Sequence, residues 1–356
     1  MNKKVIVGLS GGVDSSVTAY LLKQQGYEVI GMTMQTWDDS KNDILSQSSD
    51  ELIIKDAKRV AKALGIEHHV LDFHEEFRKE VINYFIDEYK NARTPNPCVV
   101  CNRAIKWKAL FTAAEKFGAD YVATGHYAKI EKLENGRYVI MNSKTAQKDQ
   151  TYALYNLTQE QLAKTLLPVG KYEKTRIREI AEEAKIPVAN KKDSQDICFI
   201  KDGDYASFIE RETKQSFEKG KFVDIYGNVL GEHKGIIHYT IGQRKGLGIT
   251  AATPLFVKEI RPETNEVVVC QSDDLFSKVC YVENVNFMAI PKLEGPYSTV
   301  GKIRYSHKGS ECVIEPVTET KIKCTFNEPQ RAFTPGQSAV FYEDGHVLCG
   351  GTIVLR

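Results

Sequence analysis

Apolar and polar residues follow two different patterns along this chain, and the change between them divides it. In the first 204 residues, apolar runs of strand length precede stretches in which apolar residues recur every three or four positions, as at Val13, Val17 and Tyr20. Beyond Leu255, apolar residues recur at every second position in short runs separated by turn residues. The first pattern predicts a parallel sheet built from strand–helix–strand units, and the second predicts a small antiparallel β-barrel.

The first part contains the more detailed predictions. Strands are expected at residues 5–8, 27–34, 69–73 and 121–126, and helices at 54–64, 77–85 and from about 102 to 117. The dipeptide Asn135-Gly136 predicts a hairpin within residues 129–141. Residues 157–190 are expected to be helical, with basic residues at 171, 174, 176 and 178 that form either a solvated face or an RNA contact. Residues 191–203 are expected to form a loop.

Composition shifts near residue 205, where glycines increase and the helical periodicity stops. In residues 238–246, basic side chains alternate with aromatic ones and glycines, a pattern that weakly indicates a nucleic-acid surface. A chain of 356 residues is also too long for one ordinary core. We therefore expect three domains, at residues 1–204, 205–275 and 276–356.

The overall composition is that of a globular protein, with 42% hydrophobic and 27% charged residues. A net charge of +1 argues against a generally basic surface, although a local basic patch would suffice to bind RNA. No segment resembles a signal peptide, and no apolar run reaches the roughly 18 residues of a membrane span. We expect a cytoplasmic protein without a membrane partner.

The segment from Val5 to Ser16 predicts a strand, a tight turn and a helix. Gly11 and Gly12 allow the backbone to approach an anion, and the amides of the following helix favour negative charge. The turn could also close an ordinary strand–helix unit. No lysine follows the glycines, so the P-loop spacing is absent. The sequence Ser-Gly-Gly-x-Asp-Ser resembles instead the PP-loop of the ATP pyrophosphatases, which implies adenylation of the substrate.

Three of the eight cysteines carry candidate chemistry, whereas the five at 270, 280, 312, 324 and 349 lie in alternating stretches and are expected to be buried. Cys98 and Cys101 stand three residues apart, just before a predicted helix whose N-terminus would lower a thiol pKa. A redox pair or half a zinc site are alternatives, but the second pair of ligands is missing at zinc-finger spacing. Cys198 lies on a predicted polar loop, where a purely packing role would be unusual.

Taken together, these segments resemble the bacterial tRNA-specific 2-thiouridylases over essentially the whole chain. The likeness rests on residues 8–15, 93–102, 123–127, 148–150, 193–199, 242–248 and 304–305. It implies a PP-loop domain of the adenine nucleotide alpha-hydrolase type, a central tRNA-binding domain and a C-terminal barrel. It also implies ATP-dependent 2-thiolation of the wobble uridine in tRNAs that read Lys, Glu and Gln codons.

The resemblance assigns roles to individual residues. It implies that Cys101 is the catalytic nucleophile and that Cys198 carries the persulfide. Cys101 would either release the sulfur from the carrier and leave a Cys101–Cys198 disulfide, or attack the adenylate first. The ATP-binding residues would be Gly8, Leu9, Ser10, Gly11, Gly12, Val13, Asp14, Ser15, Met34 and Gly125. The tRNA-binding residues would be Asn96, Pro97, Cys98, His126, Lys148, Asp149, Gln150, Arg304, Tyr305 and Gln337.

The chemistry of the residues agrees with that reading. ATP would adenylate the uracil O2 with loss of pyrophosphate, and the terminal sulfur of the persulfide would then displace AMP at C2. Mg²⁺ would bridge the ATP phosphates, with Asp14 as a candidate helper. A cysteine desulfurase or a sulfur-relay protein would supply the sulfur.

Family members often carry Asp where this chain has Cys98. Cys98, Cys101 and Cys198 could therefore hold three irons of a [4Fe–4S] cluster, an alternative to the persulfide with no other metal expected. Two rival functions also stay open. One is a PP-loop ligase that amidates its substrate with ammonia, and the other is a non-catalytic RNA-binding protein.

Overall fold

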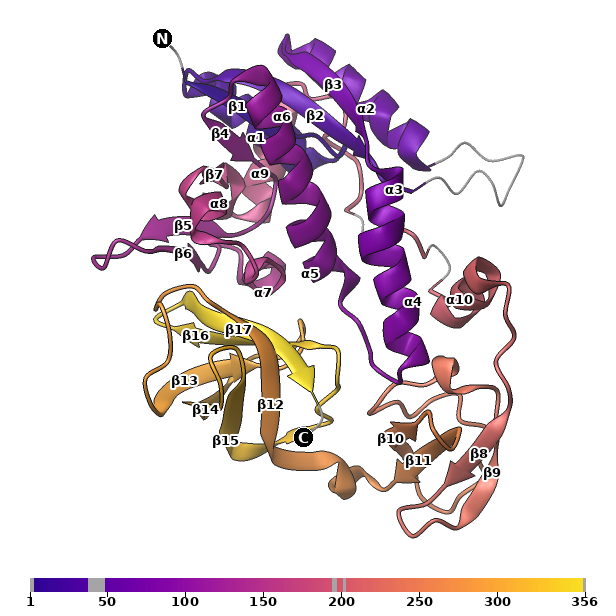
Figure 1. Ribbon diagram of the computed structural model, residues 1–356. Helices are drawn as coiled ribbons and strands as arrows, with labels where there is room; N and C mark the ends of the chain where they lie inside the picture. The colour runs from indigo at the N-terminus through magenta and orange to yellow at the C-terminus, as the bar shows by residue number, and fades with distance from the viewer. Residues whose placement is uncertain (1–2, 38–48, 194–196, 201–202, 355–356) are drawn as a thin grey trace.

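The computed structural model describes residues 3–37, 49–193, 197–200 and 203–354. Its elements form three groups: a parallel sheet flanked by helices, a small mixed sheet, and an antiparallel barrel (Figure 1). The predicted fold class is therefore confirmed. No helix within the described ranges is long and apolar enough to cross a bilayer.

The parallel sheet has β1 at its centre because Val5, Ile6 and Val7 are fully buried and can only lie between two covered faces. One face packs on α1, α2 and α9, and the opposite face packs on α6. The strand order is β3-β2-β1-β4-β7. The bounds are β1 (Lys4–Gly8), α1 (Val13–Gln24), β2 (Glu28–Gln35), α2 (Ser49–Leu64), β3 (Glu67–Asp72), α6 (Trp107–Phe117), β4 (Tyr121–Ala123), β7 (Thr165–Leu166) and α9 (Lys174–Glu183).

Two long helical segments run from the sheet towards the other groups (Figure 1). The first comprises α3 (His74–Phe77), the π turn η2 (Arg78–Ile82) and α4 (Asn83–Lys90), and the second comprises α5 (Pro97–Cys101), the π turn η3 (Asn102–Lys106) and α6. The second segment begins at Pro97, about five residues earlier than predicted. Asn96 caps it by accepting a hydrogen bond from the Val99 amide, and proline suits the first helical position. Gly118 ends it in a left-handed conformation.

Two other expectations were wrong. Residues 157–190 are not helical throughout, because Thr165 and Leu166 pair with β4 as a fifth strand between α8 (Gln159–Ala163) and the short 3₁₀ turn η5 (Pro168–Lys171). Helical structure also continues past residue 205 as α10 (Tyr205–Thr213), whose Phe208 and Ile209 are buried in the cluster around α4. The predicted hairpin is confirmed as β5 (Lys129–Lys132) and β6 (Tyr138–Met141).

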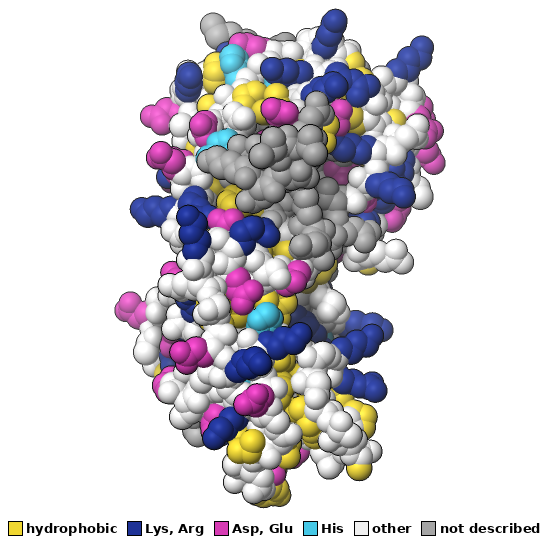
Figure 2. Space-filling view, turned by 90° about the vertical axis from the view of Figure 1, so that its right-hand side faces the viewer, with side chains coloured by type: hydrophobic (Ala, Val, Ile, Leu, Met, Phe, Trp, Pro, Cys, Tyr) yellow, Lys and Arg dark blue, Asp and Glu magenta, His cyan; other side chains and the backbone are white. Residues whose placement is uncertain are grey.

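The central group is a four-stranded sheet with the order β10-β11-β8-β9. Its bounds are β8 (Gly220–Val223), β9 (Val229–His233), β10 (Phe256–Arg261) and β11 (Glu266–Cys270). Phe222 and Tyr239 anchor its small core. Apolar side chains also reach the surface on the lower part of Figure 2, and the β8–β9 turn leaves Tyr226 84% exposed.

The last group is a six-stranded antiparallel barrel, closed by pairing between β12 and β17. Its bounds are β12 (Phe276–Phe287), β13 (Tyr297–Lys302), β14 (Ser310–Pro316), β15 (Ile322–Arg331), β16 (Ser338–Glu343) and β17 (His346–Val354). The five cysteines expected to be buried are buried. The barrel core is continuous with apolar residues of the first group, including Trp107 and Tyr152, and β17 pairs with β6.

Candidate active site

The turn between β1 and α1 is shaped by two glycines with different tasks. Gly11 has a φ of +64°, and a Cβ there would lie 2.8 Å from the Ile53 carbonyl oxygen, so only glycine fits. Gly12 is the N-cap of α1 and offers no side chain to its first amides. The Ser15 hydroxyl accepts from the Ser10 amide at 3.2 Å and donates to the Gly12 carbonyl. The helix therefore presents uncapped amides and its positive end at a fixed turn, as an anion site requires.

Asp14, in the first turn of α1, is bound by side chains from far along the chain. The Tyr127 hydroxyl donates to its Oδ1 at 2.7 Å, and Lys174 Nζ donates to both carboxylate oxygens at 2.7 and 2.9 Å. Desolvation and the Asp14 charge raise the pKa of Tyr127, which keeps its hydroxyl protonated as a donor. The sequence motif contains Asp14 but not Lys174, which was expected on a solvated face or at an RNA contact, and it did not indicate a bond from Tyr127 to Asp14.

A second carboxylate, Asp193, forms ion pairs with three basic side chains, one of which is Lys174. Lys148 and Lys174 each lie 2.9 Å from it and Arg178 lies 3.1 Å away. Although burial raises the pKa of Asp193, the hydrogen bonds from Lys174 and Lys148 outweigh burial and lower that pKa below its ordinary value. Asp193 is therefore ionised at neutral pH.

These contacts divide the basic cluster at the start of α9. Lys174 and Arg178 face the carboxylates, whereas Arg176 pairs on the surface with Glu179 and Glu183. A further lysine, Lys191, donates to the Gly11 carbonyl at 3.1 Å and pairs with Asp56 at 2.7 Å. The cluster is thus partly a solvated face and partly the lining of the glycine turn.

Of the two residues expected from later strand ends, Gly125 lies against the start of α1, whereas Met34 lies elsewhere. A Cβ on Gly125 would lie 2.6 Å from the Ser15 amide nitrogen, so the segment after β4 touches the first turn of α1 through its backbone. Met34, half-buried at the end of β2, packs against the cluster around α4.

The three candidate thiols lie near one another. Cys101 is half-buried at the end of α5, whereas Cys98 and Cys198 are exposed. Desolvation, followed by the charges of Cys101 and Cys98, raises the pKa of Cys198 to about 12, and the charge of Lys106 opposes this shift. Residues 194–196, just before Cys198, lie outside the described residues.

The predicted lowering of the thiol pKa at this helix was wrong for Cys101. Desolvation raises the pKa of Cys101, and Lys106 offsets only part of the effect. The reason is positional: the helix begins at Pro97 and continues through η3 into α6, so Cys101 is not at its N-terminus. The positive charge near this thiol comes from a lysine side chain instead.

The charge of Lys106 acts both on the thiols and on His126, the residue after Gly125. Lys106 follows Cys101 by five residues across the π turn η3, in which the Trp107 amide donates to the Asn102 carbonyl. A π turn has a wider repeat than an α-helix and so changes which side chains share a helix face. Lys106 also acts on His126, whose pKa is held well below its ordinary value by desolvation first and by this charge second. His126 follows Gly125, packs on the Trp107 ring and shares a 2.7 Å hydrogen bond between Nδ1 and Thr124 Oγ1.

Most residues expected to contact tRNA already have partners within the protein. Asp149 accepts from the Ser143 and Thr151 amides at 2.7 and 3.1 Å, and Gln150 Oε1 accepts from the Tyr127 amide at 2.8 Å. Tyr305 is 53% exposed and donates to the Asp149 carbonyl at 3.1 Å.

The other expected tRNA contacts lie around the thiol segment or on the barrel. Asn96 and Pro97 begin α5, Lys148 pairs with Asp193, and Arg304 is exposed on the barrel. Gln337 donates to the Thr94 and Pro95 carbonyls at 3.0 and 3.2 Å, so its amide braces the segment that leads to Cys98. Such bonds fix the shape of this surface.

The residues present do not fit a metal cluster. No group of three His, Cys, Asp or Glu side chains within the described ranges is arranged to hold a metal ion. Cys98, Cys101 and Cys198 are thus neighbours without the ligand arrangement that the [4Fe–4S] alternative needs.

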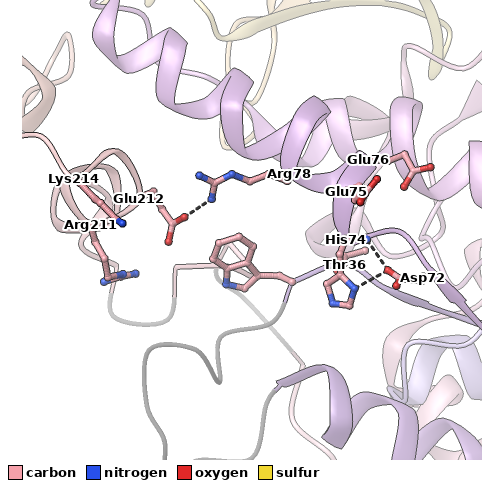
Figure 3. Close-up of a pocket in the computed structure, with 10 residues that line it drawn as sticks. Thr36, Asp72, His74, Glu75, Glu76, Arg78, Arg211, Glu212 and Lys214 are labelled. Carbon is pink, nitrogen blue, oxygen red and sulfur yellow. Dashed lines mark hydrogen bonds and ion pairs between the residues drawn. The ribbon is translucent and has the colours of Figure 1, made fainter.

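A separate pocket of about 1130 Å³ lies beside the ends of β2 and β3 and is also lined by α3 and the end of α10. Figure 3 shows His74 beside Asp72 and Arg78 facing Glu212 across it. Trp37, also in its lining, packs on Phe208 with ring centroids 5.7 Å apart. None of its described lining residues is a predicted site residue.

Comparison with known proteins covers all three groups of elements. Family models match residues 3–202, described as a tRNA methyl transferase HUP domain, residues 206–271, described as a PRC-barrel domain, and residues 277–353, described as an aminomethyltransferase β-barrel domain.

Curated relatives match over nearly the whole length. Proteins named tRNA-specific 2-thiouridylase MnmA are 54% identical in Lachnoclostridium phytofermentans, 55% in Clostridioides difficile and 52% in Clostridium kluyveri. The matches cover 99% of this chain and 98 to 99% of each relative. Because relatives more than 50% identical match this chain over nearly its whole length, the chain belongs to the tRNA-specific 2-thiouridylase family.

Proposed function

We propose that this protein is a tRNA-uridine 2-sulfurtransferase that converts the wobble uridine of tRNA to 2-thiouridine at the expense of ATP. The names and full-length identity of its relatives support this function. The observation that carries it is that Cys101 lies close enough to Cys198 to raise the pKa of that thiol, in a chain that also has an uncapped glycine turn at the start of α1. tRNAs that read Lys, Glu and Gln codons are the proposed substrates.

The proposed reaction has three steps. The uracil O2 attacks the α-phosphorus of ATP, and pyrophosphate leaves with the electron pair of the broken P–O bond. The terminal sulfur of a Cys198 persulfide then attacks C2, and AMP leaves with the former O2 oxygen. The Cys101 thiolate attacks the inner sulfur of the carrier, and the S–S bond to the sulfur now on C2 breaks with its electron pair going to that sulfur. A Cys101–Cys198 disulfide remains, which an external thiol must reduce.

The partners follow from this chemistry. We propose that ATP binds at residues 8–15 with Met34 and Gly125, and that Mg²⁺ is held mainly by the ATP phosphates, since both Asp14 oxygens already accept from Lys174. A persulfide-bearing donor protein would load Cys198 in the cytoplasm. We also propose that the three domains span residues 1–204, 205–275 and 276–356.

Thiolation is favoured over the other readings by the residues present. A methyl transfer, as in the family descriptions, would use neither a phosphate turn nor two thiols. An amidating ligase would use the turn but not the thiols. A non-catalytic RNA-binding protein would not need the ordered contacts of Ser15 and Asp14.

The test is nucleoside mass spectrometry of tRNA treated with the purified full-length protein, ATP, Mg²⁺ and a persulfide donor. We expect 2-thiouridine from the unaltered protein, none from Cys101→Ser or Cys198→Ser, and product from Cys98→Ser. An unthiolated but amidated base, or full thiolation by both serine variants, would refute the proposal. Loss of product in Cys98→Ser together with bound iron and sulfide would favour the cluster alternative.

A further inference from the structure

We propose that Lys174 binds the β- and γ-phosphates of ATP and thereby replaces the lysine that a P-loop would carry after its glycines. The inference rests on the proposed use of ATP and adds to it a residue that the sequence motif does not contain. Lys174 stands at the start of α9, 160 positions after Asp14 in the chain. Only the packing of α9 against α1 brings the two together.

The ammonium group of Lys174 lies beside the first turn of α1, which directly follows the two glycines. Its Nζ lies 2.7 Å from Asp14 Oδ1, on the second residue of α1, and 2.9 Å from Asp193. It also lies 5.5 Å from the centre of the Tyr127 ring, and the side chain is only 14% exposed. A lysine that is partly desolvated and held by three groups is pre-positioned, so little side-chain entropy remains to be lost when an anion binds.

The cations around Lys174 outnumber the carboxylates, so the cluster can accept a further negative charge. Four cations, Lys148, Lys174, Arg178 and Lys191, pair with the carboxylates of Asp14, Asp56 and Asp193, and Arg59 also pairs with Asp56. Asp193 alone accepts from three of the four cations, which is the coordination that a phosphate group would take. Asp193 therefore competes with phosphate for Lys174.

The role in the reaction follows from the charge that develops. When the bond between the α-phosphorus and its bridging oxygen breaks, negative charge accumulates on the departing pyrophosphate. Lys174 would stabilise that charge while remaining protonated, with no proton transferred. Asp14 and Tyr127 act as positioning residues for the ammonium group.

Isothermal titration calorimetry of the full chain with three probes tests this role: inorganic pyrophosphate with Mg²⁺, ATP with Mg²⁺, and AMP. We expect Lys174→Met to weaken pyrophosphate and ATP binding at least tenfold and to leave AMP binding unchanged, because AMP lacks the phosphates in question. Lys174→Arg should restore most of the lost affinity. Asp193→Asn should tighten pyrophosphate binding by removing the competing carboxylate.

Arg176→Met is the matched control, since Arg176 lies on the same helix but pairs only with surface glutamates, and it should bind all three probes as the unaltered protein does. Unchanged pyrophosphate binding in Lys174→Met would overturn the inference, as would an equal loss of AMP binding, which indicates a structural role. Weaker or equal pyrophosphate binding in Asp193→Asn would contradict the competition. If the unaltered protein bound neither ATP nor pyrophosphate, the proposed function itself would fail.

Discussion

Lys106 is the charged side chain that favours the thiolate forms of Cys101 and Cys198. Desolvation raises the pKa of both thiols, and the ammonium group of Lys106 acts in the opposite direction on each. The motif C-x-x-C does not reveal this, because the lysine lies five positions after Cys101 and comes near it through a π turn. The nucleophile of a sulfur transfer is the thiolate, so this charge bears directly on rate.

Replacing Lys106 should therefore change the pH at which the thiols react. In Lys106→Met we expect the midpoint pH for alkylation of Cys101 and Cys198 by iodoacetamide to rise by about half to one unit, because the positive charge that favours the thiolate is lost. A rise of one unit corresponds to ~1.4 kcal/mol. Peptide mass spectrometry across a pH series measures it. Lys106→Arg should keep the original midpoint, and Lys108→Met, at an exposed site on α6, is the control. An unshifted midpoint in Lys106→Met would contradict the assignment.

His126 should make the folded state sensitive to mild acid. Its pKa in the fold is well below the ordinary value of 6.5, first through desolvation and then through Lys106. Below pH 6.5 the unfolded chain binds a proton that the folded protein does not, so stability falls as the pH decreases, by up to about 1.4 kcal/mol per pH unit.

Urea unfolding of His126→Gln at pH 5.5 and pH 7.5 checks this effect. The free energy of unfolding should depend less on pH in the variant than in the unaltered protein. His69→Gln, at a site on β3 paired with Glu67, serves as the comparison. An equal pH dependence in His126→Gln and the unaltered protein would show that His126 is not the group responsible.

At the scale of elements, the contact between β4 and α1 is set by one glycine. Gly125→Ala places a methyl group where the Ser15 amide nitrogen would be 2.6 Å away, so the loop and the start of α1 must separate. We expect at least about a tenfold loss of ATP affinity, or ~1.4 kcal/mol, and an overpacking cost of about 1 to 3 kcal/mol in stability.

Gly118→Ala provides the matched control for calorimetry with ATP. Gly118 has a φ of +62° and open space around its Cβ position, so alanine there incurs only the left-handed backbone cost of roughly 1 to 2 kcal/mol. Its ATP affinity should stay unchanged although its stability falls. If both variants bound ATP as tightly as the unaltered protein, the close approach at Gly125 would have no bearing on the site.

The elements themselves were predictable where a local signal exists. Strands with uninterrupted apolar runs, such as Val5–Val7, and the Asn135-Gly136 hairpin follow from periodicity and turn chemistry. The two-residue strand Thr165–Leu166 has no such signal, since it is a strand only because β4 offers it a hydrogen-bonding edge. The early start at Pro97 depends on the Asn96 cap, whose side chain accepts from the Val99 amide before the apolar periodicity begins.

At the scale of the whole molecule, the barrel supports the segment that carries the thiols. Gln337, on the turn before β16, donates two hydrogen bonds to the carbonyls of Thr94 and Pro95, and the Thr94 amide donates to the Pro335 carbonyl at 2.8 Å. A continuous core joins the barrel to α6 and α7 (Thr151–Leu154). The segment that leads to Cys98 and Cys101 is thus positioned by a part of the chain 243 residues away.

Gln337→Met keeps the size of this side chain but cannot donate. We expect a loss of about 1 to 3 kcal/mol in unfolding free energy, because two partly buried carbonyls lose their partner. Hydrogen exchange in residues 94–101 should also become faster. Gln271→Met, at an exposed position between the central sheet and the barrel, should change neither quantity. Unaltered hydrogen exchange in Gln337→Met would show that the hydrogen bonds of Gln337 do not hold residues 94–101 in place.

The sequence by itself determined the order of fold types, the glycine turn and the identity of the three exposed or half-buried thiols, because each is encoded by neighbouring residues. Tertiary structure alone decided which charges surround them. Lys174 reaches Asp14 from 160 positions away, and Lys106 turns towards Cys101 through a π turn. Burial also reversed the direction predicted for the Cys101 pKa. Electrostatic effects depend on distance and desolvation in the folded chain, and neither quantity is written in local sequence.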